Sequence, residues 1–292
     1  MYLIYFAVPV LLVIPVGIYL FYYLRRAAES CHLNIERRAA KTILIILSAV
    51  LVIPAANIWG FWAVVILHWF GFALCMEILN GIVRKAQGRT KKNMWNLIYR
   101  SGLAPVLATA VVLGYGYWNM GNIVETNYTV ETQKAIRSEG YRVAMISDLH
   151  FGTTMGKEKL KEYCLNIEET APDLVVLCGD IVDERTTLGE MQEAFETLSS
   201  ISSPLGIFYV YGNHDQSHYS SDPNFTAAEL EETIRSNGIQ ILADEMVQVT
   251  EDMAIAGRKD RSSYLMDGRV DAETLLGNAD RDDFLILADH QP

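Results

Sequence analysis

The first 118 residues contain apolar stretches whose lengths predict membrane helices. Met1–Leu24 carries no charge and has neither the basic start nor the small-residue end of a signal peptide, which favours a retained helix. Thr42–Val83 runs for 42 residues, and as one helix it would measure about 63 Å, twice a roughly 30 Å hydrocarbon core. We therefore expect it to cross twice. The local breakers where its turn should fall are Pro54, Asn57 and Gly60. Ser101–Trp118 is a fourth expected span.

The remaining residues alternate short apolar runs with amphipathic ones. Strands are expected at Tyr141–Ser147, Asp173–Cys178, Gly206–Tyr211, Ile239–Leu242, Met246–Val249, Met253–Ala256 and Phe284–Leu287. Helices are expected at Gly156–Thr170 and Leu188–Ser200, after a Thr226–Glu229 capping box, and at Asp271–Leu276. This alternation predicts an α/β fold whose sheet is covered on both faces.

Charge divides the chain at the same point. Residues 1–118 carry 11 basic and 3 acidic side chains, a net of +8, whereas residues 119–292 carry 13 and 32, a net of −19. An acidic soluble part argues against nucleic acid as its partner. Four widely spaced cysteines without a CxxC pair indicate neither a disulfide framework nor a zinc finger.

The basic residues of the first part predict the orientation of the spans. Two loops hold ten of them: Arg25, Arg26, Arg37, Arg38 and Lys41 in one, and Arg84, Lys85, Arg89, Lys91 and Lys92 in the other. The positive-inside rule assigns both loops to the cytoplasm, and two crossings between them allow this. We therefore expect a multi-pass cell-membrane protein with a four-helix transmembrane domain at 1–118. A linker and first strand follow at 119–139, then an extracytoplasmic soluble domain at 140–292.

Polar side chains gather where the expected strands end. Ligands of α/β folds bind beyond the carboxyl ends of the strands. Four ends deliver them in this chain: Asp148-Leu149-His150, Gly179-Asp180, Gly212-Asn213-His214-Asp215 and Asp289-His290. Mixed oxygen and nitrogen ligands suit Mn, Fe or Zn, and two such cations sharing Asp180 could activate a water and clamp phosphoryl oxygens.

These motifs resemble the calcineurin-like metallophosphoesterase superfamily, over roughly residues 140–292. The segments 256–260 and 289–292 resemble a membrane-anchored bacterial subgroup. The resemblance implies a β-sandwich flanked by helices and a site for two divalent metals. The implied ligands are Asp148, His150 and Asp180 for the first metal, and Asp180, Asn213 and His290 for the second. It also implies that His214, oriented by Asp215, stabilises the phosphoryl transition state or protonates the leaving group.

The family's Gly-His-x-His segment is not present in this sequence. We therefore expect a domain truncated at its C-terminus, with an open sheet edge. Asp183 and Glu184 are interpreted as solvated loop charges, and His218, Tyr219 and Asp222 as a surface loop.

Two main hypotheses for function follow from these features. The first is a membrane-anchored phosphohydrolase that cleaves phosphomonoester, phosphodiester or pyrophosphate bonds through a dinuclear metal-bound hydroxide, with lipid-linked or cell-envelope phosphates as candidate substrates. The alternative is a catalytically inactive membrane module that binds a ligand or partner on a degenerate fold. A channel or transporter is disfavoured, because His68 and Glu77 are the only ionisable side chains within Thr42–Val83.

Overall fold

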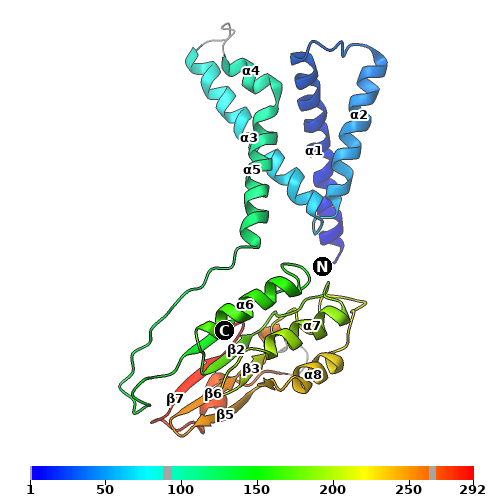
Figure 1. Cartoon of the computed structure of the whole chain (residues 1–292). Coiled ribbons are helices and arrows are strands. Elements are labelled where there is room, and N and C mark those ends of the chain that lie inside the picture. Colours follow the sequence, from blue (N-terminus) through cyan, green and yellow to red (C-terminus); the bar gives the residue numbers. More distant parts are fainter. Residues whose placement is uncertain (1, 88–93, 263–267) are drawn as a thin grey trace. The chain divides into compact units, whose positions relative to one another are not determined.

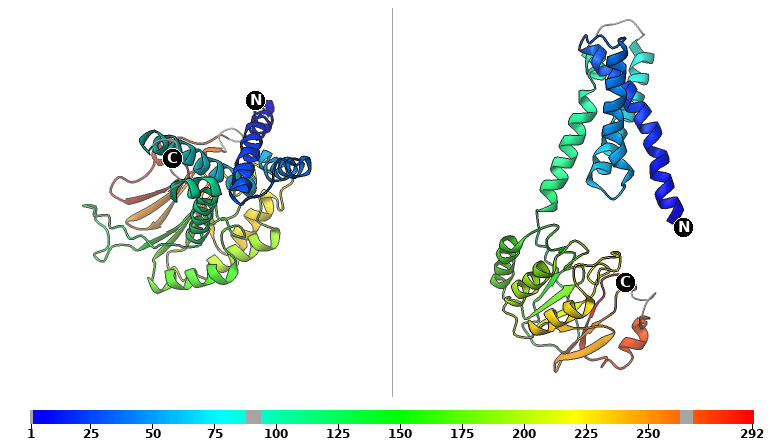
Figure 2. Two further views of the ribbon diagram at one scale, coloured as in Figure 1. Left: turned by 90° about the horizontal axis from the view of Figure 1, so that it is seen from above. Right: turned by 90° about the vertical axis from the view of Figure 1, so that its right-hand side faces the viewer.

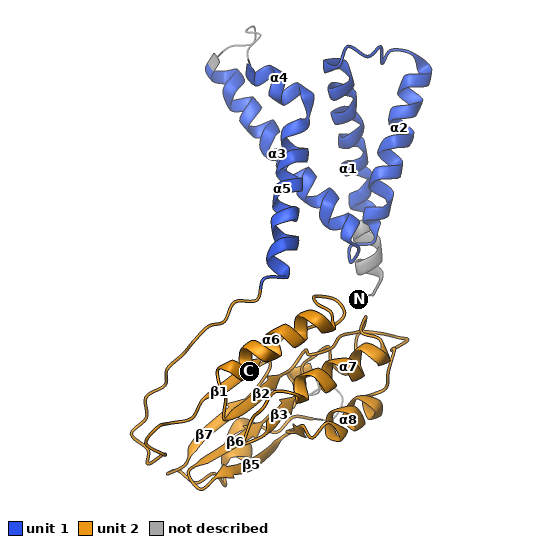
Figure 3. Ribbon diagram, viewed as in Figure 1, with its two compact units in different colours: residues 1–122 blue, residues 123–292 orange. Residues whose placement is uncertain are grey.

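The chain forms two compact units, residues 1–122 and 123–292, in a computed structural model that describes residues 2–87, 94–262 and 268–292 (Figure 3). The first unit contains only helices, and the second holds every described strand. The boundary lies four residues beyond the predicted end of the membrane domain. Arg89, Lys91 and Lys92, which belong to the expected second cytoplasmic loop, lie outside the described residues.

The first unit consists of α1 (Tyr2–Ser30), α2 (Arg38–Val52), α3 (Phe61–Gln87), α4 (Met94–Ser101) and α5 (Leu103–Met120) (Figure 1). Three stretches are long and apolar enough to cross a membrane: Leu11–Ser30, Arg38–Ala56 and Phe61–Ala86. The expected break inside Thr42–Val83 is confirmed. A 3₁₀ turn at Ile53–Ala56 is followed by a bend in which the Gly60 N–H donates to the Asn57 carbonyl, at 2.9 Å.

The fourth expected span is broken near its start. Helices α4 and α5 meet at Gly102, and their axes are bent by 65°; together they pass the length and hydropathy requirements for one span. Gly102 has φ 72°, a left-handed conformation that glycine adopts without a steric cost. The described residues therefore offer three candidate spans by length and hydropathy, and a fourth if α4 and α5 act as one.

The charge at Glu77 of α3 is neutralised by neighbouring helices. Its Oε1 lies 2.6 Å from Arg26 Nη1 of α1 and accepts a hydrogen bond from the Tyr19 hydroxyl at 3.0 Å. The Tyr99 hydroxyl of α4 donates to its other carboxylate oxygen. His68, by contrast, places Nδ1 2.8 Å from the Val64 carbonyl of its own helix.

The second unit is built on a four-stranded parallel sheet. Strands β1 (Val143–Ile146), β2 (Leu174–Cys178), β3 (Ile207–Val210) and β4 (Gln240–Ile241) lie side by side in sequence order. Three helices connect them: α6 (Lys157–Glu169), α7 (Leu188–Ser199) and α8 (Ala227–Ser236). Right-handed crossovers between strands in sequential order place every helix on the same face, as the ribbon shows (Figure 1).

A second sheet covers the other face. Strand β6 (Met253–Gly257) pairs antiparallel with β5 (Glu245–Thr250) and parallel with β7 (Phe284–Ala288), which follows the short helix α9 (Ala272–Leu276). Alternate residues of β2 enter two different cores. Val175 and Leu177 pack with the helices, whereas Leu174 and Val176 pack with the second sheet.

This layering explains why β2 is apolar throughout, since a strand buried on both faces has no solvent side. Figure 2 shows the same helices and sheets from two further directions. The predicted elements from Tyr141 onwards are confirmed, with ends that differ by at most two residues. The first strand expected within 119–139 is wrong, since the structure has no strand there and the sheet begins at β1. The Thr226–Glu229 capping box is also formed.

Candidate metal centre

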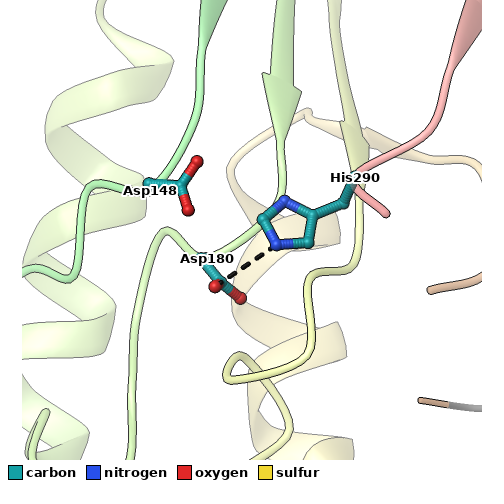
Figure 4. Close-up of side chains that lie close together, drawn as sticks. All are labelled: Asp148, Asp180 and His290. Carbon is teal, nitrogen blue, oxygen red and sulfur yellow. Dashed lines mark ion pairs between the residues drawn. The ribbon is translucent and has the colours of Figure 1, made fainter. Parts of the chain in front are cut away.

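Side chains from three strand ends converge at one point. Asp148 follows β1, Asp180 follows β2 and His290 follows β7, and their ligand atoms all lie within 4.8 Å of one another (Figure 4). His290 Nε2 lies 3.3 Å from Asp180 Oδ2. The other ring nitrogen, Nδ1, lies 2.8 Å from the Cys178 carbonyl, and this contact directs Nε2 towards the aspartate. Two carboxylates and an imidazole therefore meet although they come from both sheets.

His150 approaches the same carboxylate oxygen from another side. Its Nε2 lies 3.7 Å from Asp180 Oδ2, and its Nδ1 lies 3.2 Å from Asp183 Oδ2. The backbone supports this approach, because the His150 N–H donates to the Asp180 carbonyl at 2.9 Å. The contact with Asp183 is the largest cause of a raised pKa at His150, although burial acts in the opposite direction.

Asn213 and His214 complete the group on the loop after β3. Asn213 is buried, and its Oδ1 accepts a hydrogen bond from Gln291 Nε2 at 2.7 Å. The backbone N–H of His214 donates to Asp180 Oδ1 at 2.9 Å. Its ring lies edge-on to that of His150, with centroids 5.3 Å apart. The structure thus brings together Asp148, His150, Asp180, His290 and His214, and the Asn213 side chain contacts Gln291, the residue next to His290.

Asp215 has a different set of contacts from the one expected. Its carboxylate accepts hydrogen bonds from the backbone N–H groups of Asp180 at 2.8 Å, Val182 at 3.1 Å and Gly212 at 2.6 Å. The carboxylate that faces the His214 ring belongs to Glu184, whose Oε2 lies 2.9 Å from Nδ1. Burial raises the pKa of Asp215, against the lowering effect of the Gly212 and Val182 N–H groups. Asp215 therefore holds the turns that carry the site.

The backbone at the centre is strained and crowded. Asp148, His150 and Asp180 have φ values of 55°, 44° and 54°, in the left-handed region that costs a residue with a Cβ about 1–3 kcal/mol. A Cβ on Gly212 would lie 2.1 Å from Asp180 Oδ1, so glycine is required where these two loops touch. Backbone conformations of this kind cluster at functional sites.

The interpretation of Asp183 as a solvated charge is wrong. Only 7% of the residue is exposed, and its Oδ1 accepts the backbone N–H of Arg185 at 2.8 Å. Burial would raise its pKa, but the contacts with His150 and the Arg185 N–H outweigh that effect and lower it. The sequence signal for Asp183 and Glu184 was their position three and four residues after Asp180, in the same strand-end loop. The three residues of the expected surface loop, His218, Tyr219 and Asp222, are exposed.

The chemistry of these residues fits a divalent cation. Asp180 is 3% exposed, and a carboxylate so deeply buried needs neighbouring donors or a cation. Its Oδ1 accepts one N–H, while its Oδ2 faces the imidazoles of His150 and His290. Carboxylate oxygen and imidazole nitrogen are ligands that suit Mn, Fe and Zn.

Comparisons with known proteins point in the same direction. The family model for calcineurin-like phosphoesterases matches residues 141–292. A Danio rerio transmembrane protein with metallophosphoesterase domain is 27% identical over 241 residues, which cover 78% of this chain and 53% of that protein. The uncharacterized metallophosphoesterase YkuE of Bacillus subtilis is 28% identical over 69% of this chain and 71% of its own length.

A shorter match involves a protein whose name states a substrate. The UDP-2,3-diacylglucosamine pyrophosphatase LpxG of Chlamydia trachomatis is 30% identical over 127 residues, 41% of this chain and 38% of that protein. The chain spans about half the length of the zebrafish relative.

Proposed function

Because this chain belongs to the calcineurin-like phosphoesterase family, we propose that it is a metal-dependent phosphohydrolase, cleaving phosphomonoester, phosphodiester or pyrophosphate bonds. The observation that carries the proposal is the convergence of Asp148, Asp180 and His290 from three separate strand ends. The two carboxylates repel one another at such short range unless a cation joins them. Their gathering in a strained backbone supports a metal-binding role over a structural one.

We propose that two divalent transition metals, of the Mn, Fe or Zn type, bind at this centre. The residues that would hold the first are Asp148, His150 and Asp180, and those for the second are Asp180, Asn213 and His290. Such ions supply Lewis-acid stabilisation of phosphoryl oxygens and lower the pKa of water. Asp180 is suited to the shared position, since its Oδ2 faces ligands of both sets.

His214 is proposed as the residue that stabilises the phosphoryl transition state or protonates the leaving group. Its Nδ1 is engaged by Glu184, so Nε2 is the nitrogen that would serve the substrate. Glu184 fixes the ring orientation, and a general acid must be held in a fixed position relative to the leaving group. Asp215 contributes indirectly, by holding the backbone of Asp180 and Gly212.

The membrane unit suggests where the substrate lies. We propose that α4 and α5 together form a fourth span, and that the positive-inside rule places the second unit outside the cytoplasm. A phosphate that is attached to a lipid or to the cell envelope would be within reach of an enzyme anchored in this way. The name of the chlamydial relative, a pyrophosphatase acting on a diacylated nucleotide sugar, supports a lipid-linked substrate.

The test is hydrolysis of p-nitrophenyl phosphate and bis(p-nitrophenyl) phosphate by the full chain in detergent, with Mn²⁺ or Zn²⁺ added. We expect activity that a chelator removes and that the same metal restores. The Asp180→Asn variant should lose about a hundredfold or more. Asp282→Asn makes the same chemical change at an exposed position and should leave the rate unaltered. Metal-independent activity, or full activity in Asp180→Asn, would remove the proposal.

A further inference from the structure

An ion cluster surrounds Asp289, the residue immediately before His290. Asp289 follows β7, and its side chain is 7% exposed. Arg258, the first residue after β6, places Nη1 2.9 Å from Asp289 Oδ2. Arg269 Nη2 contacts the other carboxylate oxygen, Oδ1. One carboxylate is therefore engaged on both oxygens by two guanidinium groups from different segments.

The same arginines also bind the backbone on both sides of His290. The backbone N–H of Arg258 donates to the Ala288 carbonyl at 3.0 Å, which extends the β6–β7 pairing past the last paired residues. Arg269 Nη1 donates to the Gln291 carbonyl at 3.1 Å. Residues 288, 289 and 291 are thus all held by Arg258 or Arg269, and His290 lies between them.

The cost of burying this cluster argues for a role beyond stability. The Arg258 and Arg269 side chains are 15% and 8% exposed, and they bring two positive charges to one negative charge. A buried ion pair is weak evidence for stability, because desolvation offsets much of its attraction. The cluster instead contributes defined geometry, since a planar guanidinium makes directed hydrogen bonds to two acceptors at once. The cluster is therefore suited to fixing the position of a short segment.

That segment reaches the proposed ligands of the second metal. His290 presents Nε2 to Asp180, and Gln291 Nε2 donates to the Asn213 side chain at 2.7 Å. We propose that Arg258 and Arg269, acting through Asp289 and Gln291, are positioning residues that orient His290 and Asn213 for metal binding. The inference rests on the proposed function, because it presumes that the centre binds metal. Residues that orient metal ligands affect affinity by about 10–100-fold without touching the ion.

The experiment measures Co²⁺ binding to the full chain in detergent, by calorimetry and by visible absorption, which reports the geometry around the ion. The variants are Arg258→Lys, Arg269→Lys and the double variant, which keep the positive charge and lose the two-pronged bond. The matched control is Arg137→Lys. Arg137 forms an ion pair with Asp173 just before β2, at the opposite end of the sheet from the centre.

We expect the wild-type chain and Arg137→Lys to bind Co²⁺ alike. The double variant should bind about 10–100-fold more weakly and show an altered absorption band, with a metal-free melting temperature close to that of the control. A double variant with unchanged affinity and spectrum overturns the inference while leaving the proposed function intact. If the double variant does not fold, the Co²⁺ affinity and the absorption band of Arg258→Lys are compared with those of the wild-type chain instead, and unchanged values overturn the inference. A wild-type chain that binds no Co²⁺, Mn²⁺ or Zn²⁺ overturns both proposals together.

Discussion

Glu184 Oε2 lies 2.9 Å from Nδ1 of His214, and this carboxylate, not that of the adjacent Asp215, faces the imidazole ring. The two acidic residues divide two tasks. Glu184 can orient the ring, whereas Asp215 is fully buried and bonded to backbone N–H groups. Replacing each in turn should therefore have different consequences.

For Glu184→Gln we expect kcat to fall about tenfold with little change in KM. Glutamine keeps the length of the side chain but replaces the carboxylate that contacts His214 Nδ1 with a neutral amide, which is a weaker hydrogen-bond acceptor. His214→Ala should cost more, about 10²–10⁴-fold, because it removes the proton donor itself. The check is a series of phosphate esters, in which both losses should grow as the leaving group becomes more basic. Equal losses across the series would argue against proton transfer by His214.

For Asp215→Asn we expect lost stability instead. The new amide places N–H donors against backbone N–H groups, and each buried group left without an acceptor costs about 1–3 kcal/mol. Hydrogen–deuterium exchange should increase at 178–182 and 210–215. All five tryptophans lie within the first 118 residues, so tryptophan fluorescence cannot report on the second unit. Protection equal to that of the wild-type chain would contradict the role assigned to Asp215.

Gly212→Ala should abolish metal binding through sterics alone. The added Cβ would lie 2.1 Å from Asp180 Oδ1 and 2.4 Å from the Asp180 backbone nitrogen, so Asp180 must move. Gly189→Ala is the matched control, because a Cβ there meets nothing within 4 Å and alanine favours its helix by up to about 1 kcal/mol. Metal titration by calorimetry should separate the two variants. Normal binding by Gly212→Ala would show that this close approach is not required.

The pH dependence of stability should reveal the ion pair between Arg137 and Asp173. Burial alone would raise the pKa of Asp173, but Arg137 and the Arg142 backbone N–H outweigh it and lower the pKa. A lowered pKa contributes stability that is complete above the unfolded value, about 3.9, and is lost as pH falls through the folded value. The calorimetric unfolding temperature of Asp173→Asn should thus fall less than that of the wild-type chain between about pH 5 and about pH 3. If the unfolding temperatures of the variant and the wild-type chain fall equally over this pH range, the Arg137–Asp173 ion pair does not contribute to stability.

The proposed orientation predicts which cysteines an impermeant maleimide reaches in intact cells. Cys31 lies exposed between α1 and α2, in the loop expected to face the cytoplasm, and should stay unlabelled until the membrane is opened. The Asn127→Cys variant places a thiol in the exposed linker and should label at once. Both measurements use a Cys75→Ser background, since Cys75 is also exposed. If Cys31 labels in intact cells and Asn127→Cys does not, the second unit lies in the cytoplasm.

The sequence by itself determined the elements and the location of the site. The 42-residue length of Thr42–Val83 requires two crossings, and the structure breaks it where the glycine and proline signals predicted. Asp148, Asp180 and His290 follow apolar runs that could be identified as strands. Parallel strands bring the ends of β1 and β2 to one edge, so the grouping of Asp148 with Asp180 follows from local pattern and topology. His290 reaches them from β7 of the second sheet, which the packing of the two sheets decides.

Only the tertiary structure decided which partner each polar side chain has. Glu184 and Asp215 both lie in strand-end loops, and no periodicity distinguishes a side chain that meets His214 from one that turns inward to backbone N–H groups. The link between Asp289 and Arg258 likewise joins residues 31 positions apart. Hydrophobic pattern specifies a face of a helix or strand, whereas a contact between loops depends on backbone directions that arise only when the sheets have packed.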